Sequence, residues 1–430
     1  MLITNQLKIL TLALLVGCLQ CQYAQAGSAQ QLFSEYHDQI YQVRLIELAS
    51  GSKSSIGSAF QINPDGLLAT NFHVVADAVH KPEKYRVEYI NHEGKKGELQ
   101  ILDIDVVHDL ALLKHQDGFN KYFRFANKPL QQGEEVFSLG NPRDLGMTVV
   151  PGTYNGLLAH SYYDRILFSG SLNPGMSGGP ALNAGGEVIG VNVATSGNQL
   201  SFLVPLQELN NLVSSYMRSQ GEYVGDFKKK IEQQLKENQK KQLTELIDAE
   251  WPQSTLGEAQ IVGEMTRFTR CWGGSSEEEK KALYEHTYNQ CFSESDIYLS
   301  SHFSTGAINY EFYWLESAQL NAKQFYARYK SSVEGAGPVN RGATEEDVGN
   351  FECNTEFVDQ PRKNQRPLVW KNIICARPYK QYEGLYDLVF IGATLSDHHR
   401  GLISHFALSG VTKELGMRFT QKFLERVVWK

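Results

Sequence analysis

Short apolar segments separated by turn residues fill the chain from about residue 40 to residue 205. The segments are rich in Val, Ile, Leu, Tyr and Phe, and turn signals such as NPDG at residues 63–66 and AGG at residues 184–186 interrupt them. Many short strands at regular spacing are typical of a closed or sandwiched all-β domain. The pattern therefore predicts an all-β domain in the first half of the chain.

Two segments with helical spacing follow these strands. Residues 206–217 form the first, and we expect this helix to close the all-β domain. Its apolar face consists of Leu206, Leu209, Leu212 and Val213. Residues 226–250 form the second, which is rich in Lys, Gln and Glu and carries one narrow apolar stripe. The stripe consists of Phe227, Ile231, Leu235, Leu243, Leu246 and Ile247.

The stripe of residues 226–250 has two interpretations. The helix is either an arm through which the chain forms a homo-oligomer, or a linker packed on one of two domains. After it, residues 307–313 and 385–390 alternate like strands, whereas residues 317–333 and 412–428 have helical spacing. We expect an α+β domain there, with an antiparallel sheet and two or more helices. Its residues do not indicate its role.

The first 26 residues predict export from the cytoplasm. Lys8 precedes an apolar run over residues 9–19, which is too short to span a bilayer, and the small-residue pattern AQA follows at residues 24–26. This order is typical of a bacterial secretory signal peptide, so we expect a periplasmic or secreted protein. LVGC at residues 15–18 also resembles a lipoprotein box. In that alternative the protein is lipid-anchored through Cys18, and only then is a membrane a partner.

Charge and cysteine usage narrow the function further. Acidic residues exceed basic ones by 48 to 41, so no polybasic surface argues for nucleic acid. Four cysteines remain after the signal peptide, all in the second half, and an oxidising compartment favours two disulfides among them. Three pairings are open, of which we expect the sequential one. It joins Cys271 to Cys291 and Cys353 to Cys375. The spacing lacks a Cys-x-x-Cys pair, which disfavours a metal site.

A serine surrounded by glycines stands out at residues 173–183, in the sequence NPGMSGGPALN. A serine hydroxyl is a weak nucleophile unless a base takes its proton and donors hold the oxyanion that forms. His73, in ATNFHVV, and Asp109, in VVHDLALL, lie upstream. The order His, Asp, Ser is that of chymotrypsin-like double barrels. His108 and Asp105 are nearby alternatives, but Asp109 directly precedes the apolar strand LALL.

These segments together resemble the trypsin-like serine proteases of the HtrA/Deg type. Further similar segments are GSAF at 57–60, NPDGLLATN at 63–71, SLGNP at 138–142, TVVPG at 148–152, GVN at 190–192 and FLVP at 202–205. The resemblance covers roughly residues 35–215, about half of the chain. Nothing after that region resembles the PDZ module that usually follows in this family.

The resemblance implies a chymotrypsin-like fold of two six-stranded barrels with the site between them. Together with the length it suggests four parts: a signal peptide (1–26), a trypsin-like serine protease domain (27–220), a helical linker (221–254) and an α+β C-terminal domain (255–430). The implied activity is that of an exported serine endopeptidase that needs no cofactor and cleaves polypeptides through an acyl-enzyme. The alternative is a catalytically silent, binding or chaperone-like protein with a protease fold.

Each site residue has an implied role. Ser177 attacks the scissile carbonyl, His73 carries the proton, Asp109 holds the tautomer of His73, and the N–H groups of Gly175 and Ser177 form the oxyanion hole. Met176 stands where this family more often has Asn. The hole is therefore either formed without that partner or switched by substrate or another domain.

The residues around the serine loop indicate where the primary substrate pocket lies. We expect it near Leu172, Asn173, Val193 and Thr195. No acidic residue stands just before the serine loop, which disfavours cleavage after Lys or Arg. Small to medium aliphatic residues are therefore the expected preference.

Overall fold

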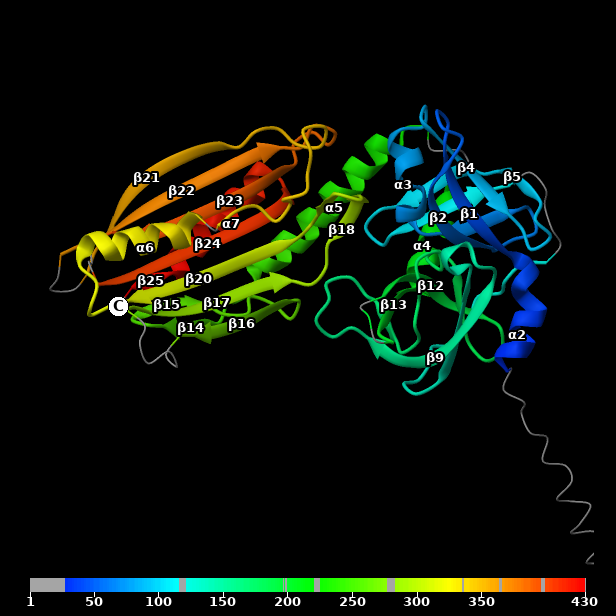
Figure 1. Cartoon of the computed structure of the whole chain (residues 1–430), viewed down its shortest axis with the longest axis horizontal. Helices are drawn as coiled ribbons and strands as arrows, with labels where there is room; N and C mark the ends of the chain where they lie inside the picture. Colours follow the sequence, from blue (N-terminus) through cyan, green and yellow to red (C-terminus); the bar gives the residue numbers. More distant parts are fainter. Residues whose placement is uncertain are drawn as a thin grey trace, which may run out of the picture.

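A computed structural model describes residues 28–115, 121–195, 197, 199–219, 225–276, 283–334, 336–362, 366–395 and 399–429. Two domains are joined by the long helix α5 (Phe227–Asp248), which Figure 1 shows running from one to the other. The predicted signal peptide, with Cys18, lies outside the described residues. Among the helices that the structure describes, none is long and apolar enough to cross a membrane.

The first half of the N-terminal domain is an antiparallel sheet in the order β5-β4-β1-β2-β3-β7-β6. Its strands are β1 (Ile40–Glu47), β2 (Lys53–Gln61), β3 (Leu67–Thr70), β4 (Tyr85–Ile90), β5 (Lys96–Glu98), β6 (Gln100–Asp105) and β7 (Leu110–Lys114). Helix α3 (Phe72–His80) links β3 to β4, and α2 (Ala29–Tyr36) with the short turn η1 (His37–Gln39) precedes β1.

This half has seven strands where a six-stranded barrel was expected, because one strand bends. Only Leu99 separates β5 from β6, and its N–H donates to the carbonyl of Val87 over 2.9 Å. β5 pairs with β4, and β6 pairs with β7. The two edges of the sheet are therefore joined through the chain itself at Leu99.

The second half is a closed barrel of six strands, as expected, in the order β10-β13-β12-β11-β8-β9. The strands are β8 (Glu135–Gly140), β9 (Thr148–Leu157), β10 (Ile166–Phe168), β11 (Pro180–Leu182), β12 (Val188–Thr195) and β13 (Ser201–Pro205), with the turn η2 (Pro142–Asp144) after β8. Helix α4 (Leu206–Arg218) follows and buries Leu209 and Leu212. Phe60 and Leu112 of the first half share one buried cluster with Leu139 of the second, so the two halves are packed together.

A seven-stranded antiparallel sheet forms the C-terminal domain, in the order β16-β17-β20-β24-β23-β22-β21. Its strands are β16 (Thr269–Ser275), β17 (Glu285–Ser293), β20 (Ile308–Glu316), β21 (Glu352–Gln360), β22 (Leu368–Pro378), β23 (Tyr386–Thr394) and β24 (Arg400–Val411). Smaller sheets contain β14 (Gln253–Leu256), β15 (Ala259–Val262) and β25 (Val428–Trp429), and the hairpin β18 (Ile297–Ser300) and β19 (Phe303–Thr305).

Helices cover both faces of this sheet (Figure 1). On one face, Phe419 and Phe423 of α7 (Lys413–Arg426) pack against Phe406 of β24. On the other, Phe325 and Tyr329 of α6 (Ala322–Glu334) share a buried cluster with β20 and β24. Two disulfides link paired strands in the expected sequential pairing. They are Cys271–Cys291 between β16 and β17, and Cys353–Cys375 between β21 and β22.

The whole apolar stripe of helix α5 is buried against other parts of the same chain. The stripe's first half, Phe227, Ile231 and Leu235, is buried in a cluster with the first sheet of the N-terminal domain. The second half, Leu243, Leu246 and Ile247, is buried in the core of the C-terminal domain. The helix thus packs on both domains rather than on one, and the stripe expected for a homo-oligomer contact is already covered.

Candidate active site

His73 and Asp109 are brought together at one end of the neighbouring strands β3 and β7. His73 is the second residue of α3, and Asp109 lies in the turn between β6 and β7 with a positive φ of 60°. The side chain of Asn71, just before α3, donates to the carbonyl of Asp109 over 2.8 Å. This bond holds the turn in a backbone conformation that is uncommon for a residue with a side chain.

Both carboxylate oxygens of Asp109 bind His73. Oδ1 accepts from the backbone N–H over 2.8 Å, and Oδ2 lies 2.7 Å from Nδ1 of the ring. With Nδ1 donating to the carboxylate, Nε2 is left as the acceptor of the neutral ring. Burial lowers the pKa of His73, but the charge and hydrogen bond of Asp109 raise it by more, so the pKa lies above its ordinary value.

The serine loop packs directly beside the histidine helix. The carbonyl of Ser177 accepts from the N–H of Ser58 over 2.8 Å. A Cβ on Gly57 would lie 2.6 Å from the methyl carbons of Val74 and 3.2 Å from the Ser177 carbonyl oxygen, so only glycine lets these segments meet. The Ser177 hydroxyl itself donates to the carbonyl of Val193 over 2.9 Å. The structure therefore brings the three predicted residues to one place, with the hydroxyl turned toward β12.

Two backbone N–H groups of the loop are left available for an oxyanion. The Pro174 carbonyl accepts from the N–H of Arg143 over 2.8 Å, and the N–H of Gly175 points the opposite way because the peptide is trans. Gly175 has φ 98°, and a Cβ there would lie 2.5 Å from the carbonyl oxygen of Asn141. Within the described residues, neither Gly175 nor Ser177 donates its N–H to a protein acceptor.

The side chain of Met176 is held by burial in an apolar core and not by polar contacts. Its side chain is fully buried in the core of the six-stranded barrel, together with Phe168 and Leu172. The Met176 carbonyl accepts from the Nδ2 amide of Asn192 over 3.3 Å, while the Oδ1 of Asn192 accepts from the Ser138 hydroxyl over 2.6 Å. The loop is therefore anchored from inside the barrel.

Sequence reasoning missed the residues that hold this loop. Asn192 lies in the segment GVN and Ser58 in GSAF, and neither residue has a role that the sequence alone indicates. The Ser58 hydroxyl donates to the Gly175 carbonyl over 2.8 Å and accepts from the N–H of Asn141 over 3.0 Å. Buried polar residues within strands were the available signal, since such groups need partners.

The residues expected for the substrate pocket lie in different environments. Leu172 belongs to the barrel core, whereas Asn173 is exposed and its amide donates to the Ser171 carbonyl over 3.4 Å. Val193 is half-buried on β12 and offers the carbonyl that Ser177 binds. Thr195 ends β12, and its side chain lies outside what the structure describes.

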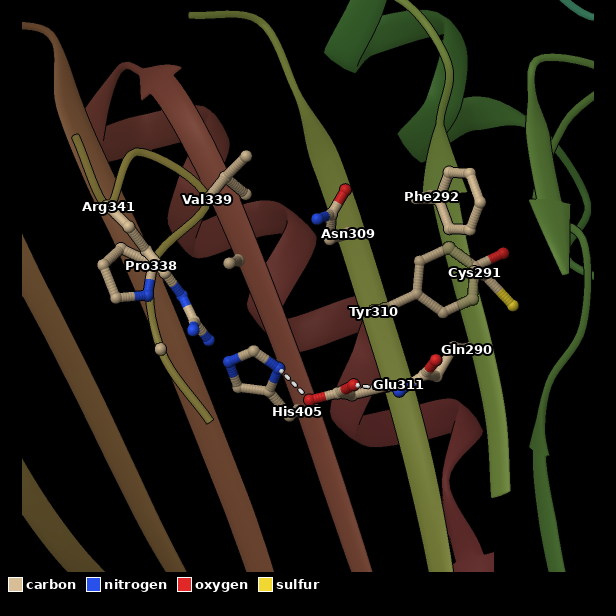
Figure 2. Close-up of a pocket in the computed structure, with 12 residues that line it drawn as sticks. Gln290, Cys291, Phe292, Asn309, Tyr310, Glu311, Pro338, Val339, Arg341 and His405 are labelled. Atoms are coloured by element: carbon tan, nitrogen blue, oxygen red, sulfur yellow. Dashed lines mark hydrogen bonds and ion pairs between the residues drawn. The ribbon is translucent and has the colours of Figure 1, made fainter. Parts of the chain in front are cut away.

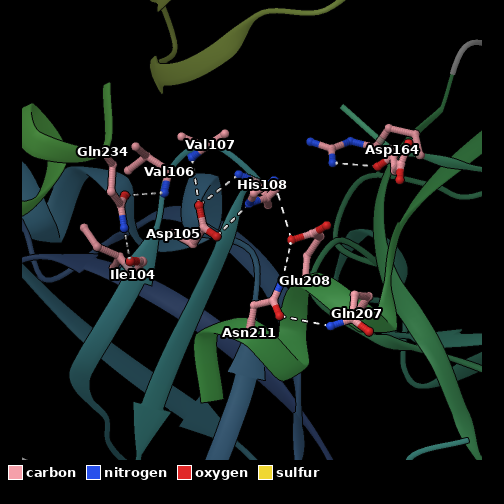
Figure 3. Close-up of polar contacts among 11 residues, drawn as sticks. Ile104, Asp105, Val106, Val107, His108, Asp164, Gln207, Glu208, Asn211 and Gln234 are labelled. Atoms are coloured by element: carbon pink, nitrogen blue, oxygen red, sulfur yellow. Dashed lines mark hydrogen bonds and ion pairs between the residues drawn. The ribbon is translucent and has the colours of Figure 1, made fainter. Parts of the chain in front are cut away.

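His108 and Asp105 form a second histidine–carboxylate pair, which Figure 3 shows next to α4. Nδ1 of His108 lies 2.7 Å from Oδ2 of Asp105, and Nε2 lies 3.6 Å from Oε2 of Glu208. Burial lowers the pKa of His108, but Asp105 and Glu208 raise it by more. These three residues link the first sheet to α4. His108 is therefore paired with Asp105, and the carboxylate paired with His73 is that of Asp109.

A hollow with a volume of about 260 Å³ lies on the C-terminal sheet (Figure 2). Nδ1 of His405 lies 3.1 Å from Oε1 of Glu311 there. The one thiol residue of its lining, Cys291, is in a disulfide, and no hydroxyl residue except Tyr310 lines it. The hollow therefore lacks the parts of a serine-type site. In the described part of the chain, no group of three His, Cys, Asp or Glu residues could hold a metal ion.

Comparison with known proteins points to one family. Residues 57–191 match the family described as "Trypsin-like peptidase domain". A probable periplasmic serine endoprotease, DegP-like, of Chlamydia pneumoniae is 33% identical over 179 residues, which are 39% of this chain and 36% of that protein. Serine protease HTRA1 of Xenopus tropicalis is 30% identical over 220 residues, 48% of this chain and 46% of that protein.

One similar solved structure is the serine endoprotease from Yersinia pestis, with 25% identity and a TM-score of 0.40 over 45% of this chain and 68% of that one. The chain spans less than half the length of the two curated relatives described above. The matched region contains His73, Asp109 and Ser177, and the relatives that match it are DegP-like and HTRA1 proteases. The N-terminal domain of this chain therefore contains a match to the trypsin-like peptidase domain and is similar to serine proteases of the HtrA type.

Proposed function

We propose that the chain is an exported serine endopeptidase that hydrolyses peptide bonds of polypeptides through an acyl-enzyme. The carrying observation is the His73–Asp109 pair, held by two hydrogen bonds beside a serine loop with two available N–H groups. Ser177, His73 and Asp109 are the proposed nucleophile, base and orienting carboxylate.

The reaction begins with a rotation of the Ser177 hydroxyl away from Val193. His73 Nε2 then accepts the hydroxyl proton while the oxygen attacks the scissile carbonyl. The N–H groups of Gly175 and Ser177 bind the oxyanion, and losing one such donor costs about 3 kcal/mol of transition-state stabilisation. His73 returns the proton to the leaving amine, and water then releases the acyl group by the same steps.

An extended substrate fits beside β12. The Val193 carbonyl is next to the nucleophile, so the N–H of the residue that becomes acylated can replace Ser177 as its donor. Peptide substrates would thus free the hydroxyl as they bind. The absence of an acidic residue just before the loop supports a preference for small to medium aliphatic residues over Lys and Arg.

Three observations support export to the periplasm. The N-terminal sequence has the features of a signal peptide, the C-terminal domain contains two disulfides, and the DegP-like relatives are named as periplasmic. Disulfides persist in that compartment. Mass measurement of the mature N-terminus distinguishes cleavage after Ala26 from acylation at Cys18.

The experiment that tests the proposal is labelling with a fluorophosphonate together with cleavage of an unfolded protein. The wild-type chain should label once, and Ser177→Ala and His73→Ala should lose labelling and cleavage by several orders of magnitude. Chelators should change neither. Cleavage that survives Ser177→Ala would overturn the assignment.

A second function is favoured by the bond from Ser177 to Val193, because the resting hydroxyl donates its proton to a backbone carbonyl and not to its base. In that alternative the domain is a silent binding or chaperone-like module. Absence of labelling and cleavage, with retained binding of an unfolded polypeptide, would support it.

A further inference from the structure

The hairpin β18–β19 of the C-terminal domain lies against the helix that carries His73. Ile297 and Leu299 of β18 are buried in one cluster with Val74, Val75 and Ala78 of α3. Figure 1 shows β18 at the side of the C-terminal domain that faces α3. A single apolar core therefore crosses from one domain to the other beneath the histidine helix.

Polar contacts fix the register of this docking. His80, the last residue of α3, donates from Nε2 to the carbonyl of Leu299 over 2.9 Å. Burial lowers the pKa of His80, which favours its neutral ring. The next residue, Lys81, lies 2.9 Å from the carboxylate of Glu346 at the surface. These contacts hold α3 at the end opposite to His73.

Tyr298, between the two buried residues of β18, reaches the imidazole itself. The rings of Tyr298 and His73 have centroids 5.8 Å apart at an interplanar angle of 69°, an edge-to-face contact. Tyr298 is half-buried, and burial, with Asp77 and Asp109 nearby, raises its pKa to about 12. The Tyr298 ring therefore covers one side of His73 and keeps water from it. The Tyr298 hydroxyl beside it is uncharged.

Helix α5 makes polar contacts with β6, the strand that precedes Asp109. Gln234 donates from Nε2 to the Ile104 carbonyl over 2.9 Å and accepts the N–H of Val106 over 3.0 Å. Lys230 forms an ion pair with the buried Asp103. The linker and the second domain thus contact the elements of both members of the His73–Asp109 pair.

We propose that Tyr298 is a positioning residue for His73, so that the C-terminal domain supplies part of the protease site. This inference rests on the proposed function, since positioning matters only if His73 is the base. The ring and the docked hairpin restrict the imidazole and α3, and they exclude water from the side of His73 that faces β18. The influence of the C-terminal domain would therefore reach the site through the histidine.

The first test measures the titration of the His73 ring by NMR in the Ser177→Ala protein, which needs no activity. Removing Tyr298 with Tyr298→Ala exposes the imidazole, and because burial disfavours the charged ring, the pKa of His73 should rise by about 0.3–1 unit. Tyr298→Phe should leave it unchanged, since the ring remains. Tyr288→Ala, a half-buried tyrosine of β17, is the control and should have no effect.

The second test measures fluorophosphonate labelling in chains that contain Ser177. Tyr298→Ala should slow labelling at pH 7 by about 3- to 10-fold, through a misoriented and more often protonated base. Tyr298→Phe should retain the wild-type rate. If Tyr298→Ala does not fold, Tyr298→Leu is the substitute. Its shorter side chain covers less of the imidazole, so it should show the same two changes at smaller size.

The outcomes separate the two proposals. Ser177-dependent labelling with a Tyr298→Ala variant that matches the wild type in rate and in the pKa of His73 overturns only the role of Tyr298. A wild-type chain that never labels overturns the proposed function and this inference with it. A changed pKa and rate in Tyr288→Ala as well would show a general loss of packing and would also overturn the role of Tyr298.

Discussion

The Ser177 hydroxyl donates to the carbonyl of Val193 over 2.9 Å, on the side of the loop that β12 occupies. The proposed nucleophile thus rests on the backbone atom that an extended substrate would use. We expect this competition to make activation depend on the substrate's own N–H.

We expect a peptidyl fluorophosphonate to react faster with Ser177 than a small alkyl fluorophosphonate does. A peptide paired with β12 donates to the Val193 carbonyl and frees the hydroxyl, which should raise the labelling rate by about tenfold or more. The matched control is the same peptidyl probe methylated at the N–H of the residue that carries phosphorus. Equal rates for the two peptidyl probes would show that Val193 does not restrain the serine.

Gly175 should be intolerant of even one added carbon. A Cβ there would lie 2.5 Å from the Asn141 carbonyl oxygen, and φ is 98°. Gly175→Ala should therefore lower Ser177 labelling by about 100-fold or more, the effect of losing an oxyanion donor. Gly133→Ala is the control, because Gly133 has a similar φ of 96° with nothing within 4 Å. A comparable loss in both variants would mean that backbone strain alone, not the oxyanion hole, is responsible.

Met176→Asn should weaken the protein rather than restore a better loop. The sequence alone suggested that a polar residue here would support the oxyanion hole, but the side chain of Met176 is fully buried among apolar residues. An amide in that core loses packing and lacks partners, so we expect about 2–4 kcal/mol less stability and slower labelling. Thermal unfolding and labelling measure the two effects. Met176→Leu should change either one little, whereas faster labelling by Met176→Asn would contradict this view.

Local sequence motifs predicted much of the N-terminal domain. His73, Asp109 and Ser177 stand within recognisable flanking sequences. The regular strand pattern predicted an all-β domain, and the resemblance to the HtrA type implied the closed six-stranded barrel of its second half. The sequential cysteine pairing was the expected one of three open pairings. The structure gives its reason, because antiparallel neighbouring strands place Cys271 opposite Cys291 and Cys353 opposite Cys375. The bend at Leu99, which turns one strand into two, has no such signal, since it depends on two neighbouring strands.

Contacts between distant segments were not predictable. Tyr298 lies more than 200 positions after His73, and nothing in the sequence of β18 indicates that it docks on α3. The stripe of α5 was visible, but a stripe does not reveal whether its partner is a second chain or two domains of the same one. The missing information is the tertiary packing, which single-sequence patterns do not contain.

The pH dependence of labelling should report the pKa of His73. Asp109 holds that pKa above 6.5, and only the neutral ring can accept the Ser177 proton, so the rate should fall as pH drops through a midpoint above 6.5. Asp109→Asn removes the charge and leaves burial, so the midpoint should move to lower pH. The plateau rate should also fall by about 10³- to 10⁴-fold, because the ring loses its tautomer. An unchanged midpoint in Asp109→Asn would contradict the assigned pair.

Reduction of the disulfides should destabilise the C-terminal domain first. Cys353–Cys375 ties the exposed edge strand β21 to β22, and Cys271–Cys291 ties β16 to β17 at the other edge of the sheet. Each bridge should contribute about 2–4 kcal/mol to the free energy of unfolding. Because β18 docks on α3, unfolding of this domain should also slow Ser177 labelling while the barrels remain folded. Labelling and circular dichroism measured together along a reductant series test this order. Loss of labelling only when the barrels unfold would show that the C-terminal domain does not act on the site.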